Sequence, residues 1–84
     1  MIKSVLVDFY AGSYQYKDAQ LHEVEDEKEF EKLKKNVKDQ LVADKLGSAK
    51  GLQSKTFWAA FNEWDTEKGG WSETEELFNE RVKV

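Results

Sequence analysis

Carboxylate side chains at a spacing that could bind a cation lie near the end of this 84-residue sequence. Four of them fall within twelve residues: Asp65, Glu67, Glu73 and Glu76. Calcium is a hard cation that prefers oxygen ligands, and a glycine lets the loop between such ligands turn sharply. Gly70 lies in the middle of this segment. The residue types therefore allow a hard cation to bind in this segment.

The same twelve residues resemble the loop of a single EF-hand. Asp65 is at the first position, Gly70 at the sixth and Glu76 at the twelfth, where that family has its first ligand, its turn glycine and its bidentate ligand. Two positions depart from the family's pattern. Gly69 at the fifth offers no side-chain oxygen, and Glu67 at the third is longer than the usual Asp or Asn. The resemblance implies a calcium site with Asp65, Glu67, Glu73 and Glu76 as its ligands. Because of the two departures we expect no tight calcium binding, and a calcium-binding module is the second hypothesis for function.

Residues on both sides of this loop have the spacing of two helices. One apolar stripe recurs at i, i+3, i+4 and i+7: Phe57, Ala60, Phe61 and Trp64. Such a stripe is typical of an amphipathic helix. Ser54 is suited to cap that helix, Gly69-Gly70 to end it, and Ser72 to begin a second helix. The pattern predicts a C-terminal helical hairpin.

The three tryptophans lie within fourteen positions of one another, among acidic residues. Tryptophan is enriched at interface hot spots because it combines a large apolar area with one hydrogen-bond donor. On the expected helices Trp64 belongs to the core, whereas Trp58 lies at the margin of the stripe and Trp71 follows the glycines. The residues predicted to bind a partner are Trp58, Trp71, Asp65, Glu67, Glu73 and Glu75. The alternative is that Trp58 and Trp71 only complete a small core.

The first half of the chain predicts a hairpin and a long helix. Residues Ile2–Tyr10 and Tyr14–Val24 are rich in strand-forming types and flank a short loop that contains Gly12. Asp26–Leu46 has a helical stripe of Phe30, Leu33, Val37 and Leu41. Asp26 is suited to cap this helix, and Glu29 to complete a capping box. The expected fold class is α+β: an N-terminal β-hairpin packed on a long amphipathic helix and a C-terminal helical hairpin. Arg81–Val84 is a candidate third strand, ranked below continued helix.

Composition and charge narrow the function classes. The chain has no cysteine and a net charge of −4, which excludes disulfides and thiolate sites and argues against non-specific nucleic-acid binding. Residues 28–55 are nevertheless basic, with eight lysines and four acids. The flank Lys34, Lys38 and Lys45 therefore supports a third hypothesis, weak nucleic-acid binding. No targeting or membrane-spanning segment is visible, so we expect one cytoplasmic domain that does not act at a membrane.

The leading hypothesis is non-catalytic protein binding. His22 is the single histidine, and no nucleophile or orienting partner accompanies it in the local sequence. We therefore expect no enzyme activity, no catalytic residues and no cofactor. The expected partner is a protein with a basic surface of the kind that binds nucleic acid, on which this chain would act as a small inhibitor or accessory factor.

Overall fold

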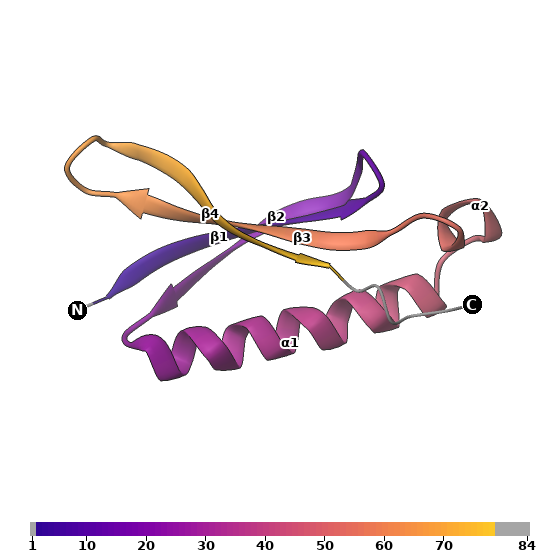
Figure 1. The fold of residues 1–84 in the computed structure, drawn as a ribbon, viewed down its shortest axis with the longest axis horizontal. Helices are drawn as coiled ribbons and strands as arrows, with labels where there is room; N and C mark the ends of the chain where they lie inside the picture. Colours follow the sequence, from indigo (N-terminus) through magenta and orange to yellow (C-terminus); the bar gives the residue numbers. More distant parts are fainter. Residues whose placement is uncertain (1, 79–84) are drawn as a thin grey trace.

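The fold is a four-stranded antiparallel sheet with a long helix along one face (Figure 1). The computed structural model describes residues 2–78, and side chains within the last strand as far as Thr74. The elements are β1 (Lys3–Ala11), β2 (Tyr14–Val24), α1 (Glu27–Leu46), α2 (Lys50–Gln53), β3 (Phe57–Asp65) and β4 (Gly70–Phe78). The strand order is β2-β1-β3-β4, and every neighbouring pair is antiparallel.

The predicted fold class is wrong, because the C-terminal helical hairpin is absent. Residues 57–65 and 70–78 form a β-hairpin, and β3 pairs with β1 along its length. The candidate third strand Arg81–Val84 lies outside the described residues. The physical reason lies in β1, whose residues are buried on one face and half-buried on the other. Such a strand belongs in the middle of a sheet, so it needs a second neighbour beyond β2.

The loop predicted to bind calcium is a tight hairpin turn. One carboxylate oxygen of Asp65 accepts hydrogen bonds from the backbone N–H groups of Glu67 (2.9 Å) and Lys68 (3.0 Å). The N–H of Gly69 donates to the Asp65 carbonyl at 2.8 Å. Gly69 has a φ of 68°, a conformation that glycine adopts without strain. These residues therefore reverse the chain between two strands rather than between two helices.

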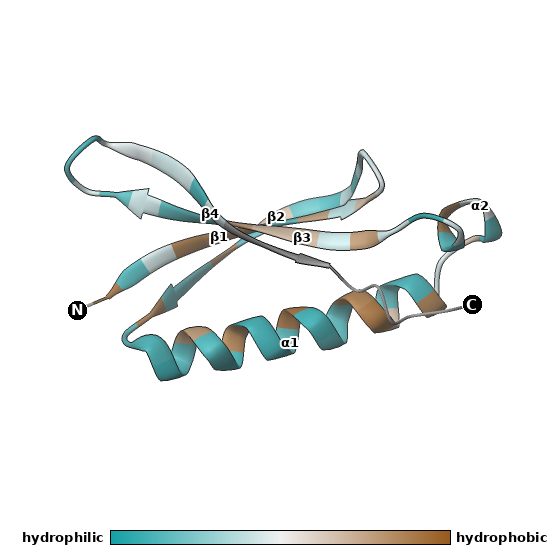
Figure 2. Ribbon diagram, viewed as in Figure 1, coloured by the Kyte–Doolittle hydropathy of each residue, from teal (hydrophilic) through white to brown (hydrophobic). Residues whose placement is uncertain are grey.

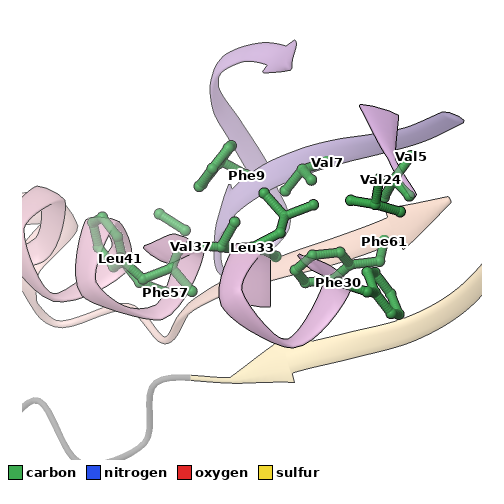
Figure 3. Close-up of a cluster of buried hydrophobic side chains, with 12 residues drawn as sticks. Val5, Val7, Phe9, Val24, Phe30, Leu33, Val37, Leu41, Phe57 and Phe61 are labelled. Atoms are coloured by element: carbon green, nitrogen blue, oxygen red, sulfur yellow. The ribbon is translucent and has the colours of Figure 1, made fainter. Parts of the chain in front are cut away.

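The core lies between α1 and the sheet, as Figure 3 shows. Alternate residues of β1 and β3 face the helix, and Val5, Val7, Phe57 and Phe61 are fully buried. The opposing helix residues are Phe30, Leu33, Val37 and Leu41, which confirms the predicted stripe. In Figure 2 hydrophobic residues recur along α1 between hydrophilic ones, as a one-sided core requires.

The start of α1 forms as the sequence predicts. Asp26 is the N-cap, and its carboxylate accepts a hydrogen bond from the Glu29 N–H at 2.9 Å. The Glu29 carboxylate in turn accepts from the Glu25 N–H at 2.7 Å. The Asp26 bond satisfies an amide donor that a helix start otherwise leaves without a partner, while the Glu29 bond goes to the residue before the cap rather than to Asp26 itself. The cap fixes where β2 ends and α1 begins.

Bulges in β2 direct two consecutive polar side chains toward α1. Tyr16 packs on Phe57, with 5.0 Å between ring centroids, and its hydroxyl donates to the Asp44 carboxylate at 2.6 Å. The Lys17 ammonium lies 2.8 Å from the same carboxylate oxygen. Burial alone would raise the pKa of Asp44, but hydrogen bonds from Lys17, Tyr16 and Gln40 and the Lys17 charge outweigh it and lower that pKa.

We predict that Asp44→Asn lowers the free energy of unfolding by about 1–2 kcal/mol at pH 7, because charge-assisted hydrogen bonds are lost. A carboxyl group with a lowered folded-state pKa stabilises the protein above its unfolded pKa of roughly 4, and the effect disappears as the pH falls through the folded value. The difference between wild type and variant should therefore shrink between pH 5 and pH 2. Urea unfolding across this range measures it. Asp39→Asn, an exposed site on the same helix, is the control, and a pH-independent difference would contradict the prediction.

A candidate protein-binding face

The sheet has a second face, on the side away from α1, that carries most of its large aromatic side chains outside the core. Successive side chains of a strand point to opposite faces, so residues next to the buried ones point away from the helix. We call this surface the outer face. Its described members include Leu6, Asp8 and Tyr10 of β1, Trp58, Ala60, Asn62 and Trp64 of β3, and Trp71 and Glu73 of β4. All three tryptophans lie on it.

One aromatic pair on the outer face is tied into the fold. Trp58 stacks on Tyr10 with 4.5 Å between ring centroids and an interplanar angle of 15°. The Trp58 indole N–H donates to the Gly12 carbonyl at 2.7 Å, which fastens β3 to the turn between β1 and β2. Trp58 is also only partly exposed. This side chain therefore contributes to stability as well as to the surface.

The second pair is far more open. Trp64 and Trp71 face each other across β3 and β4 in an edge-to-face arrangement, with 5.3 Å between ring centroids. Trp64 is 41% exposed and Trp71 is 42% exposed. Among the described residues, neither indole N–H has a hydrogen-bond partner. Two large rings with free donors are thus available to another molecule.

Acidic groups lie on the outer face and in the turn that adjoins it. Asp8 accepts hydrogen bonds from Gln15 (3.2 Å) and Asn62 (3.0 Å), which hold its carboxylate on the outer face. Glu67 is exposed in the turn beside Trp64 and Trp71, and Glu73 lies opposite Asn62. None of the outer-face residues of β1 and β3 is basic. The outer face therefore has an aromatic pair near each end of β3, with Asp8 and Asn62 between the two pairs and acidic residues near the turn.

No protein-family model, curated protein or solved structure matches this chain. No similarity therefore transfers a function to the outer face, and its role has to be argued from its own residues. Between residues 2 and 78, no helix is long and apolar enough to cross a membrane.

The structure places three of the predicted binding residues, Trp58, Trp71 and Glu73, on the outer face. Asp65 ends β3 and Glu67 lies in the adjoining turn, whereas Trp58 is six residues along β3 from Trp64, the partner of Trp71. Glu75 is in β4 opposite Phe61, and its side chain is not among those described. Sequence reasoning placed Trp64 in the core and did not select Tyr10. A period of two along β3 would have put Trp58 and Trp64 on one face.

The proposed metal ligands are spread along the hairpin. Within residues 2–78, no group of three or more His, Cys, Asp or Glu side chains is placed to hold a metal ion. Asp65 already accepts two backbone hydrogen bonds. Glu73 is three residues beyond Gly70, the residue opposite Asp65, which is about 10 Å along a strand. A calcium ion binds its ligands at roughly 2.3–2.6 Å, so these two carboxylates are too far apart for a shared site.

We predict that calcium titration gives no binding in calorimetry and no change in tryptophan fluorescence. Among the side chains that the structure describes, the carboxylates of the turn and of β4 do not converge on one point, so they cannot replace the hydration shell of the ion. A dissociation constant below ~10 μM, in the range of calcium sensors, would contradict the prediction if Glu76→Gln abolished that binding.

The lysine flank lies on the opposite side of the molecule from the tryptophans. Lys34, Lys38 and Lys45 belong to α1, which covers the other face of the sheet. Lys34 pairs with Glu31 and lies over the Phe30 ring at 5.0 Å from its centroid. Proteins that bind single-stranded nucleic acid place basic groups and stacking aromatic rings along one groove. That combination is absent from the described residues.

Proposed function

We propose that this chain is a non-catalytic protein-binding module whose outer face binds a basic surface of another protein. The observation that carries the proposal is the one-sided cover of the sheet. Helix α1 buries one face, while Trp64 and Trp71 remain about two-fifths exposed on the other. Exposed aromatic residues, tryptophan above all, are enriched among the residues that contribute most to binding at protein interfaces.

Charge favours a basic partner over a second copy of the chain. Asp8, Glu67 and Glu73 lie on or beside the outer face, so two such faces would bring like charges together. Like-charge contacts across an interface cost several kcal/mol, whereas a basic surface is attracted before contact. The phosphates of a nucleic acid would be repelled in the same way as a second copy.

The partner class that fits these charges is a protein whose basic surface binds nucleic acid. In a complex with this small domain of net charge −4, carboxylates would take the place of the phosphates that the basic surface binds. The exposed indoles would add apolar contact. Occupying that surface would inhibit the partner or hold it away from its nucleic acid. This is a binding role, and it requires no reacting group in the chain.

Affinity capture with three forms of the protein tests the proposal. The forms are wild type, the double variant Trp64→Ala/Trp71→Ala, and Leu46→Ala, which removes an exposed apolar side chain of α1 (56% exposed). We expect a protein with a basic surface to be retained by wild type and Leu46→Ala but not by the double variant, and to be displaced by heparin. Retention of the same proteins by all three forms would refute a role for the outer face.

A further inference from the structure

A cavity of about 400 Å³ opens at the end of the sheet, where β1 begins, β3 ends and β2 turns into α1. Its volume is in the range of sites that hold small ligands, roughly 300–1,000 Å³. Ile2, Val24 and Trp64 supply apolar walls, and Trp64 also belongs to the outer face. The cavity therefore adjoins the surface that we propose binds a partner.

The charged groups of this cavity carry an excess of negative charge. Four carboxylates line it, and Lys3 is the one basic residue among the lining residues. The Lys3 ammonium lies 3.0 Å from the Glu63 carboxylate and 5.5 Å from the centroid of the Phe30 ring. The chain thus already places one cation between a carboxylate and an aromatic ring in the wall of this cavity.

Two of the remaining carboxylates are available to a ligand. Asp26 is occupied as the cap of α1, but the carboxylates of Glu25 and Glu27 have no hydrogen-bond or ion-pair partner among the described residues and are exposed. Apolar walls, the partly exposed Trp64 and the exposed carboxylates of Glu25 and Glu27 together form a complement to a cation on a long apolar stem. A neutral or anionic ligand would use only part of this lining.

We propose that the cavity takes an arginine side chain of the basic protein partner; this inference rests on the proposed function. The arginine stem packs between Ile2 and Val24, and its planar guanidinium stacks on Trp64. Its fork of N–H groups reaches carboxylates in pairs, which the compact ammonium of lysine does less well. The cavity thus supplies the specific contact of an interface whose tryptophans supply its apolar area.

Capped arginine (N-acetyl-arginine amide) is the probe, and capped citrulline, of the same shape but uncharged, is its control. We expect capped arginine to bind with a dissociation constant of about 1 mM, as its few atoms allow. In proton–nitrogen NMR spectra, the amides of Lys3, Val24 and Glu63 and the indole N–H of Trp64 should shift. Capped citrulline should bind at least about tenfold more weakly.

Three variants of the chain separate a specific site from general attraction. Trp64→Ala and the pair Glu25→Gln/Glu27→Gln should each weaken capped-arginine binding at least about fivefold. Asp39→Asn, which removes an exposed charge of α1 outside the cavity, should leave it unchanged. Lys3→Met should strengthen binding about threefold, because it frees the Glu63 carboxylate for the probe. A gain of this size corresponds to the free energy of one exposed ion pair. An unfolded or weakened protein could not show that gain.

Several outcomes would overturn the inference. Equal binding of citrulline and arginine would show that charge is not recognised, and shifts scattered over α1 would show non-specific attraction. Tenfold tighter binding of agmatine, the free amine, than of capped arginine would indicate a small-molecule ligand instead of a protein side chain. If capped arginine does not bind but capture of the partner still depends on Trp71, the arginine site in the cavity is refuted and the outer face is not. If capped arginine binds but replacing Trp71 does not change capture of the partner, the role of the outer face as the interface is refuted instead.

Discussion

Phe61→Ala is expected to lower the free energy of unfolding by about 3–5 kcal/mol, the usual cost of removing a fully buried phenylalanine. Phe61 is completely buried in β3 and meets the ring of Phe30 on α1 edge to face, with 6.0 Å between centroids. Removing it leaves a cavity between the helix and the sheet. Small domains have only about 5–15 kcal/mol in total, so much of the stability should disappear. Chemical denaturation followed by circular dichroism measures the change.

Trp64→Ala is the matched comparison, because it removes a larger ring three residues away in the same strand. Trp64 lies on the outer face and is 41% exposed, so we expect a cost of only about 1 kcal/mol, since its ring already contacts water. On a helix, Phe61 and Trp64 would share one buried stripe and their replacements would cost similar amounts. Equal and large losses would therefore contradict the two-faced strand.

The elements that local patterns specify could be predicted from the sequence. Helix α1 follows from its apolar stripe and from the pair Asp26 and Glu29, and the structure has both. The hairpin of β1 and β2 follows from strand-forming residues on both sides of Gly12, which has a φ of 62°. In each case the pattern and the capping or turn residues agree, which leaves one conformation favoured.

The second hairpin could not be predicted in the same way, because β3 satisfies two periods at once. Phe57, Ala60, Phe61 and Trp64 fit a helix, while Phe57, Ala59 and Phe61 fit a strand. The latter three are the residues of β3 that belong to the core cluster. Adjacent alanines at 59 and 60 allow either choice, and alanine favours a helix. The deciding interaction is tertiary. Strand β1 is buried on one face and half-buried on the other. It pairs with β3 along its second edge, a contact that no local window contains.

The sequence predicted which types of residue form the candidate binding site, but not how those residues are arranged. Aromatic rings beside acids indicated a binding surface, and the structure places Trp58, Trp71 and Glu73 on one face. The error in secondary structure, however, assigned Trp64 to the core. On a strand, Trp64 moves to the surface and faces Trp71. Whether residues 57–65 have the periodicity of a helix or of a strand therefore decides whether Trp64 is buried or available for binding.

Trp64→Ala and Trp71→Ala are each expected to weaken binding of the basic partner by ~2 kcal/mol or more, the effect of removing a hot-spot tryptophan. Both rings are exposed in the free protein, so binding would remove their apolar area from water. The loss should appear mainly as faster dissociation. Trp58→Ala is expected to lower stability too, because the Trp58 indole bonds to the Gly12 carbonyl and stacks on Tyr10.

Charge reversal beside the rings should have a different kinetic signature. Glu67→Lys and Glu73→Lys are expected to slow association with the basic partner, more strongly at low salt, because exposed charges steer the encounter and are screened by ions. Surface plasmon resonance with the captured partner at two salt concentrations separates the two rates. Leu46→Ala, exposed on α1, should change neither rate. Full-strength binding by folded Trp64→Ala and Trp71→Ala variants would be incompatible with the outer face as the interface, because the largest exposed rings on that face would then contribute nothing to the complex.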